Sequence, residues 1–265
     1  MDWFQVTFLA LIQGLTEFLP ISSSGHLILP AKIFGWADQG LAFDVAVHVG
    51  TLLAVMIYFH KDIRLMISGW LTSLVKRQQN QESLMAWSVI VATLPAGLTG
   101  ILLNDFIELN LRSTLVIGLS TLVFGLLLWW ADAKGQRNRG ESQIKLRDAL
   151  WVGFAQALAL IPGTSRSGIT ITAALMLGLT RQAAARFSFL LSIPLIMAAG
   201  LLKGIELYQN GSETQISHTL AGGLIAFAAA LACIHVFLRL LDKVGLLPFV
   251  IYRLLLGGLL LIFFV

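Results

Sequence analysis

Residues 13–26 read QGLTEFLPISSSGH and residues 162–170 read PGTSRSGIT, two polar strings in an otherwise apolar chain. Of the 265 residues, 57% are hydrophobic and only 12% are charged. A soluble domain carries about 25% charged residues, so the composition predicts an integral membrane protein. Hydroxyls, a carboxylate, an imidazole and a guanidinium are costly at membrane depth, which makes the two strings the first candidates for a functional site.

The segments around these strings predict an all-α, polytopic helix bundle. A helix needs about 20 largely apolar residues to cross the hydrocarbon core. Two apolar stretches, 22–35 and 165–179, are too short to cross, and irregular backbone at membrane depth is tolerated only inside protein or beside a water-filled cavity. We therefore expect two re-entrant or broken helical hairpins in addition to about eight spans. The expected spans are 3–20, 43–60, 85–103, 113–131, 147–162, 184–204, 217–239 and 247–265.

The two strings also match each other, which predicts an internal repeat within one transmembrane domain, residues 1–265. Gln13 and Pro20 precede a cluster of hydroxyl residues and a glycine, and Gln156 and Pro162 do the same. Duplicated broken helices are typical of transporter folds, often as inverted repeats. A chance similarity is the alternative, because serine and glycine are common at helix interfaces in membranes.

Two polar segments, 75–82 and 132–148, carry the basic residues that favour a cytoplasmic location. The second joins the expected repeat halves, about 1–131 and 147–265. Counting spans from these loops places Glu17, at the end of the first span, on the outer side. The same count gives the two halves the same orientation in the membrane. The halves would be inverted only if the number of crossings assigned to one re-entrant piece were different. The net charge of +4 is spread over loops, which argues against a nucleic-acid partner.

Gln13 and Glu17 predict a metal site. They are four residues apart and share one face of a helix. A carboxylate and an amide oxygen can hold a hard cation such as Mg²⁺ or Ca²⁺, while water and phosphate oxygens complete the coordination. The alternative is that Glu17 is a solvated helix end.

The serine cluster predicts an anion site. Ser22, Ser23, Ser24 and Gly25 stand where a new helix begins, so their hydroxyls and backbone N–H groups suit a phosphate. A helix N-cap uses the same donors and is the alternative. His26 follows directly and could act as a general acid or base, or be a buried neutral histidine with one partner.

Arg166 predicts a phosphate clamp. It lies between Ser165 and Ser167, and Thr170 follows one helical turn later. The guanidinium is a rigid fork of donors that matches a phosphate in bidentate geometry. An internal ion pair, with Glu17 as a candidate partner, is the alternative.

Other ionisable residues in the spans predict structural roles. Asp44 and His48 are four residues apart in the second span, and Arg181, Arg186 and Arg253 lie near other spans. For all of these we expect structural pairing, or snorkelling of the charged end to the interface.

The quoted strings resemble the two signature regions of the bacterial undecaprenyl-diphosphatase family, the bacitracin-resistance type. The resemblance covers the whole chain, including PFVIYR at 248–253. It implies a hydrolase of the bacterial inner membrane that converts undecaprenyl diphosphate to undecaprenyl phosphate and inorganic phosphate. That reaction recycles the lipid carrier of peptidoglycan synthesis, and so serves cell wall biogenesis, cell shape and bacitracin resistance. The family has Glu or Gln at the first motif position, and Gln13 leaves one charged ligand fewer.

Residues and resemblance together predict a diphosphatase whose site faces the periplasm. Glu17, Ser23, His26 and Arg166 are the expected catalytic residues, and Glu17 with Gln13 is the expected holder of Mg²⁺ or Ca²⁺. Ser23 is the expected nucleophile with His26 as its base, and metal-bound water is the rival. The expected substrate-binding residues are Ser22, Ser24, Gly25, Ser165, Arg166, Ser167 and Thr170.

Two other classes of protein limit this prediction of a diphosphatase. The phosphatidate-phosphatase type-2 superfamily has a nucleophilic histidine where this chain has Thr172, so we expect a different nucleophile. The competing class is a carrier that flips a polyprenyl phosphate with the same duplicated helices. The expected partners are undecaprenyl diphosphate and membrane lipid, and the sequence leaves a homo-oligomer open.

Overall fold

The computed structural model describes residues 1–37, 39–210 and 216–265, and all their side chains except those of residues 24, 28, 29, 31–33, 104, 105, 108, 206, 207, 209 and 210. Regular structure in these ranges is helical, apart from one isolated bridge between Arg139 and Leu179. The helices are α1 (Trp3–Thr16), α2 (Ser23–Phe34), α3 (Leu41–Tyr58), α4 (His60–Lys76), α5 (Gln81–Asn110), α6 (Thr114–Lys134), η1 (Glu141–Gln143), α7 (Leu146–Ala157), η2 (Leu158–Leu160), α8 (Arg166–Met176), α9 (Arg181–Asn210), α10 (Ile216–Val244) and α11 (Leu247–Phe263).

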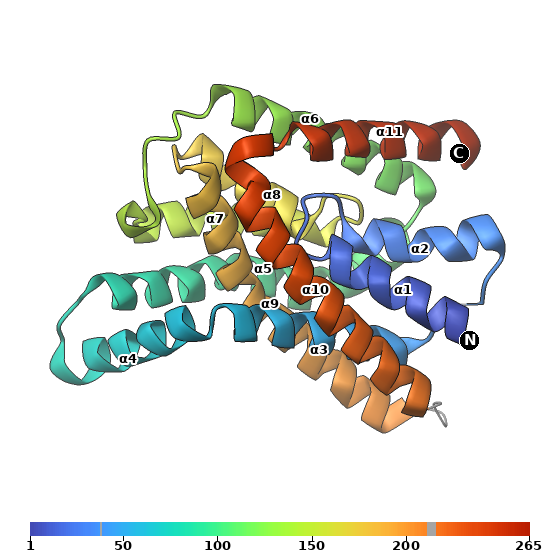
Figure 1. Ribbon diagram of the computed structural model, residues 1–265, viewed down its shortest axis with the longest axis horizontal. Coiled ribbons are helices and arrows are strands. Elements are labelled where there is room, and N and C mark those ends of the chain that lie inside the picture. The colour runs from blue at the N-terminus through green and yellow to red at the C-terminus, as the bar shows by residue number, and fades with distance from the viewer. Residues whose placement is uncertain (38, 211–215) are drawn as a thin grey trace.

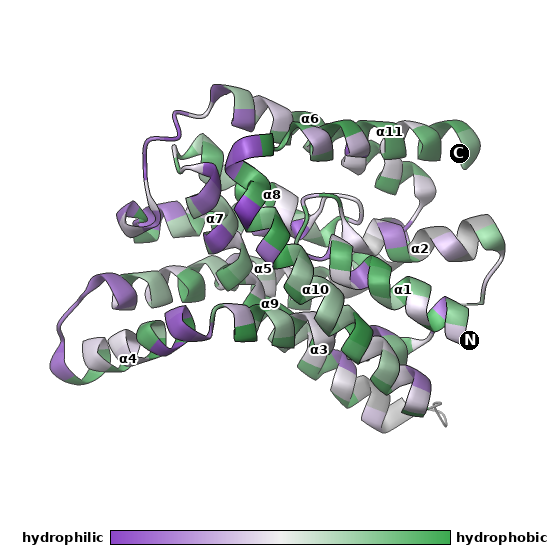
Figure 2. Cartoon of the chain, viewed as in Figure 1, coloured by the Kyte–Doolittle hydropathy of each residue, from purple (hydrophilic) through white to green (hydrophobic). Residues whose placement is uncertain are grey.

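Five helices in the described part are long and apolar enough to cross a membrane, namely α3, α5, α6, α9 and α10. Figure 2 shows that hydrophobic residues dominate the middle of the bundle, whereas hydrophilic residues gather along the loops at one end. The predicted all-α, polytopic membrane bundle is therefore confirmed.

The helices α1 and α2 form a re-entrant hairpin. α1 has 14 residues, and at about 1.5 Å per residue it is too short to cross the hydrocarbon core. Trp36, just after α2, packs against Phe4 and Phe8 of α1 with ring centroids 6.1 and 5.7 Å apart. The chain thus returns to the end of the molecule where it began, so the span expected at 3–20 is half of a hairpin (Figure 1).

The helices α7 and α8 form a second hairpin that enters from the opposite end. α7 has 12 residues, so the expected span 147–162 is also too short to cross. Arg139, before α7, donates to the carbonyl of Leu177 after α8 and pairs with Asp148 in the first turn of α7. The two open ends of this hairpin therefore meet at the basic end of the molecule, which we define as the end that carries residues 75–82 and 132–148.

Both chain termini lie at the other end, the terminal end, in Figure 1. One hairpin enters from each end and their tips meet near the middle. Each hairpin enters and leaves at the same end, so neither adds a membrane crossing. The two hairpins therefore have opposite orientations, which matches the inverted alternative. The division into halves at 1–131 and 147–265 stays a prediction.

Glycines let each hairpin pack closely on a long helix. A Cβ on Gly14 of α1 would lie 2.6 Å from the carbonyl oxygen of Ala226 on α10. A Cβ on Gly153 of α7 would lie 2.7 Å from the carbonyl oxygen of Ala92 on α5. Small residues at helix interfaces in membranes allow such backbone approach.

The helix α4 was not predicted from the sequence. It packs beside α5, where Trp70 and Trp87 make an edge-to-face contact and the Nε1 of Trp87 donates to the hydroxyl of Ser73. Its first turns carry His60, Lys61, Asp62 and Arg64, so the segment is too polar to be predicted as a membrane span.

Candidate functional site

Each hairpin turns at a serine with a positive φ angle. Ser22 has φ 74° and Ser165 has φ 70°, in a backbone region that residues other than glycine rarely adopt. Each serine also caps the next helix, because its Oγ accepts a hydrogen bond from the backbone N–H of Gly25 at 3.4 Å or of Gly168 at 3.1 Å. The two tips therefore share one local structure.

The shared cap sets the register between the tips. At this register Gln13 corresponds to Gln156, as the sequence predicts, but Pro20 corresponds to Gly163 and not to Pro162. Both glutamines are fully buried, and in the described part of the chain the Oε1 of each has no hydrogen-bond partner.

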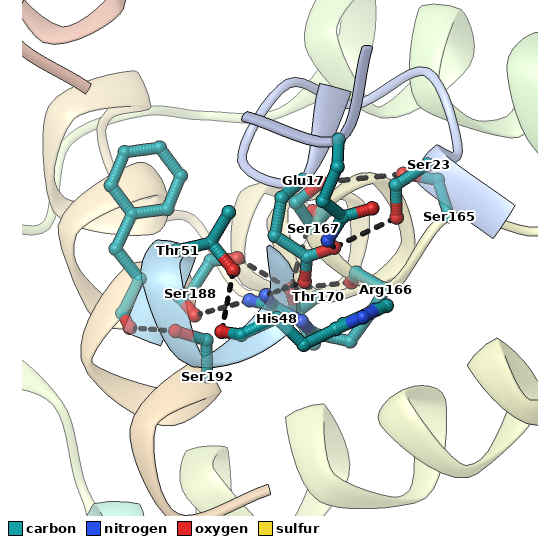
Figure 3. Close-up of polar contacts among 12 residues, drawn as sticks. Glu17, Ser23, His48, Thr51, Ser165, Arg166, Ser167, Thr170, Ser188 and Ser192 are labelled. Carbon is teal, nitrogen blue, oxygen red and sulfur yellow. Dashed lines mark hydrogen bonds and ion pairs between the residues drawn. The ribbon is translucent and has the colours of Figure 1, made fainter. Parts of the chain in front are cut away.

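The carboxylate of Glu17 lies at the centre of the site (Figure 3). Its Oε1 accepts a hydrogen bond from the Nη2 of Arg166 at 3.0 Å. Its Oε2 accepts from the Nε2 of Gln13 at 3.0 Å and from the hydroxyl of Ser23 at 2.8 Å. The second hairpin carries Leu160 at the corresponding position, so only one tip supplies a carboxylate.

Arg166 connects the second tip to Glu17 and to α9. Its side chain is only 11% exposed, and that of Glu17 is 8% exposed. Its Nη1 donates to the carbonyl of Ser188 at 3.1 Å, and Ser188 also shares a 2.7 Å hydrogen bond with the hydroxyl of Thr170. The ion pair expected as the alternative role of Arg166 is thus present. Two hydrogen bonds still leave other donors of the guanidinium for a phosphate.

Several hydroxyls predicted to bind substrate are engaged within the protein. The hydroxyl of Ser167 donates to the carbonyl of Leu19 at 2.8 Å and lies 3.2 Å from that of Ser165. The N–H of Gly25 is held by its cap serine, so the N-cap alternative is realised. The side chain of Ser24 lies outside the described residues. The earlier N–H groups of α2 and α8 have no intrahelical acceptor, as at any helix N-terminus, which suits an anion.

The structure does not bring His26 to Ser23. The Nδ1 of His26 donates to the carbonyl of Ser22 at 2.7 Å, and its Nε2 lies 2.5 Å from the hydroxyl of Tyr252, whose ring stacks on the imidazole. In the neutral ring Nε2 is the acceptor, so Tyr252 donates to it. The one-turn spacing of Ser23 and His26 was visible in the sequence, but Tyr252 comes from α11.

His48 belongs to the site, although the sequence predicted a structural role for it. It lies in the same cluster of polar side chains as Glu17 (Figure 3). Its Nδ1 donates to the carbonyl of Asp44 at 2.7 Å, and the hydroxyl of Thr51 donates to the carbonyl of His48. An ionisable residue in the middle of a membrane span was the available signal.

The residues around Glu17 fit a cation only in a limited way. Among the described residues, no three His, Cys, Asp or Glu side chains gather where they could hold a metal ion. Glu17 and the partnerless Oε1 of Gln13 are oxygen atoms of the kind that Mg²⁺ or Ca²⁺ binds, but Gln13 turns its Nε2 toward Glu17 and either cation needs six or more ligands. The donor set therefore suits a cation whose other ligands are water and phosphate oxygens.

Comparisons with known proteins agree over nearly the whole chain. The family model described as bacitracin resistance protein BacA matches residues 6–259. An undecaprenyl-diphosphatase of Chromohalobacter salexigens is 60% identical over 262 residues, 99% of each chain. One of Hahella chejuensis is 60% identical over 258 residues, 97% of each chain. One of Aliivibrio salmonicida is 55% identical over 257 residues, 97% of this chain and 96% of its own.

Proposed function

The chain belongs to the bacitracin resistance protein BacA family, and from this premise we propose that it hydrolyses undecaprenyl diphosphate to undecaprenyl phosphate and inorganic phosphate. One observation carries the proposal. Two helix N-termini, a serine hydroxyl and an arginine converge on a single buried carboxylate inside a membrane bundle. Such a set can bind a diphosphate and transfer one of its phosphoryl groups.

Binding follows from charge. The N-terminal ends of α2 and α8 carry partial positive charge and unpaired N–H groups, which favour phosphate oxygens. Arg166 adds a full positive charge and donors that Glu17 and Ser188 leave unused. As the bond to phosphorus breaks, these groups stabilise the charge on the equatorial oxygens.

Ser23 is the proposed nucleophile and Glu17 the group that accepts its proton. Their 2.8 Å hydrogen bond supports this assignment. Oγ attacks the terminal phosphorus, the bridging P–O bond breaks, and undecaprenyl phosphate leaves. Glu17 gives the proton that it took from Ser23 to the departing undecaprenyl phosphate. Water then attacks the phosphoserine and gives a proton to Glu17, which returns a proton to the Oγ of Ser23 as the P–Oγ bond breaks and inorganic phosphate leaves. Direct attack by water remains the rival, with Ser23 as a donor only.

His26 stays a predicted catalytic residue, but its ring must turn away from Ser22 and Tyr252 to reach Ser23. Glu17 and Gln13 are the residues that would hold Mg²⁺ or Ca²⁺. The cation would neutralise part of the charge of the diphosphate. The roles of Glu17 and Gln13 in holding a cation and of His26 as a base are proposals, as is the role of Ser23 as the nucleophile.

We place the protein in the bacterial inner membrane with the site open to the periplasm. The hairpin that carries Glu17 and Ser23 enters from the terminal end, away from the basic loops (Figure 1). Basic loops favour the cytoplasmic side, so the terminal end faces the periplasm.

A carrier is the second candidate, favoured by hairpins that enter from opposite ends, as in transporters. Phosphate release by the purified protein in detergent separates the two. A hydrolase releases inorganic phosphate from undecaprenyl diphosphate without a second compartment, and Ser23→Ala reduces the rate to background. No release by the parent protein, together with transport in proteoliposomes, would contradict the proposal.

A further inference from the structure

Arg253 of α11 is fully buried and holds both hairpin tips. Its Nη1 donates to the carbonyl of Pro20 at 3.2 Å and its Nη2 to that of Gly163 at 3.0 Å. Its Nε donates to the carbonyl of Thr121 on α6 at 3.2 Å. One guanidinium thus joins α6 to the first tip and to the second.

No acidic side chain in the described ranges pairs with Arg253, although its exposed fraction is 0%. A buried charge without a counter-ion is costly, so the three carbonyl acceptors must compensate for lost water. The sequence predicted pairing or snorkelling for this arginine, and the structure shows neither. A buried arginine that carries this desolvation cost needs a role other than filling space in the helix bundle.

The two carbonyls on the tips are equivalent. Pro20 and Gly163 each lie two residues before a cap serine, so the arms of one rigid fork grip the same point on both turns. Three residues beyond Pro20 stands Ser23, and three residues beyond Gly163 stands Arg166. The fork therefore sets the distance between the tip with the nucleophile and the tip with the clamp.

Two glycines make room for this side chain. A Cβ on Gly168 would lie 2.8 Å from the Nη1 of Arg253. A Cβ on Gly125 of α6 would lie 3.2 Å from its Cβ and 3.4 Å from its Nε. The three atoms nearest to that Cβ all belong to Arg253, so Gly125 offers a way to disturb Arg253 directly.

We propose that Arg253 is a positioning residue, which holds Ser23 and Arg166 on opposite sides of one phosphorus atom. The inference rests on the proposed hydrolase function. Small errors in such geometry are expensive, since a displacement of about 1 Å can cost about 10²-fold in rate. Loss of the fork should therefore lower kcat, while binding through Arg166 and the helix ends keeps KM.

The first test compares Arg253→Lys and Arg253→Gln with the parent in the phosphate-release assay, per folded molecule. Lysine keeps the charge but cannot reach three carbonyls, so we expect kcat to fall about 10- to 100-fold with KM changed less than about 3-fold. Arg181→Lys is the control, because Arg181 pairs with Asp132 away from the tips. A kcat of Arg253→Gln within about 3-fold of the parent would overturn the proposal.

If the Arg253 variants do not fold, a second test decides between the outcomes. Gly125→Ala should lower kcat about 5-fold and leave KM unchanged. This loss is smaller than the one expected when Arg253 itself is replaced. Gly258→Ala on α11 is its control, because a Cβ there meets nothing within 4 Å. Equal kcat for Gly125→Ala and Gly258→Ala would overturn the inference. An inactive parent would instead contradict the proposed function, so the two failures are distinct.

Discussion

Glu17 illustrates what single residues reveal in a sequence. Residue types at membrane depth predicted Glu17, Ser23 and Arg166 as one site, and the structure joins them by hydrogen bonds. The partners of the two histidines were not predictable. Tyr252 turns His26 away, while α3 brings His48 toward Glu17, and both depend on packing between helices far apart in the chain.

Replacing Glu17 by Gln should abolish turnover, or raise the cation requirement strongly. The amide cannot accept the proton of Ser23, and it leaves Arg166 without its counter-ion. Loss of one electrostatic group of this kind costs about 10²–10³ in kcat. The measurement is phosphate release against Mg²⁺ and Ca²⁺ concentration.

Gln13→Glu serves as the companion variant, because it adds a carboxylate on the same helix face. We expect it to keep activity and to lower the cation concentration needed for half-maximal rate. Full activity of Glu17→Gln in excess chelator would show that neither the cation nor the proton acceptor depends on this carboxylate.

At the scale of elements, hydrophobicity located most helices but not where the hairpins turn. The apolar run continues through Leu19 and Ile21, so the first arm of this hairpin looked like a span, and only Pro20 and the serines marked the turn. α4 was missed because it is not apolar enough to span. Helix length in a membrane follows from contacts with neighbouring helices, which a single sequence does not contain.

Gly153→Ala should destabilise the bundle. The new Cβ would lie 2.7 and 2.8 Å from backbone atoms of Ala92, so α7 and α5 must separate. Such overpacking costs about 1–3 kcal/mol. The midpoint of thermal unfolding in detergent measures it.

Gly97→Ala on α5 is the matched control, because its Cβ meets nothing within 4 Å. Alanine there should stabilise the helix slightly. Equal midpoints for both variants would mean that α7 does not press on α5 as closely as the structure indicates.

At the scale of the whole molecule, the charged residues mark one end. Arg186 pairs with Asp62 at 2.6 Å and with Glu141 at 2.7 Å, which joins α4 and η1 to α9. Arg181 pairs with Asp132 at the same end. The basic loops at this end and the two re-entrant hairpins were predictable, but the short length of α1 and α7, which removes two expected crossings from the count, was not.

Cysteine labelling tests the orientation. On a Cys233→Ser background, Ala37→Cys lies at the terminal end and Gln136→Cys at the basic end, both at exposed positions. An impermeant thiol reagent applied to intact spheroplasts should label Ala37→Cys only. Both should react once the membrane is opened. Labelling of Gln136→Cys alone before opening would reverse the proposed orientation.

The opposed hairpins make the site sensitive to bilayer thickness. The two tips belong to hairpins that enter from opposite ends of the molecule (Figure 1), so a thicker or thinner bilayer should pull the tips along the membrane normal in opposite directions. Ser23, the proposed nucleophile, and Arg166, the proposed clamp, lie on different tips. Membrane tension and lipid chain length should therefore act on the distance between Ser23 and Arg166, and the guanidinium of Arg253, which joins both tips, should resist that change.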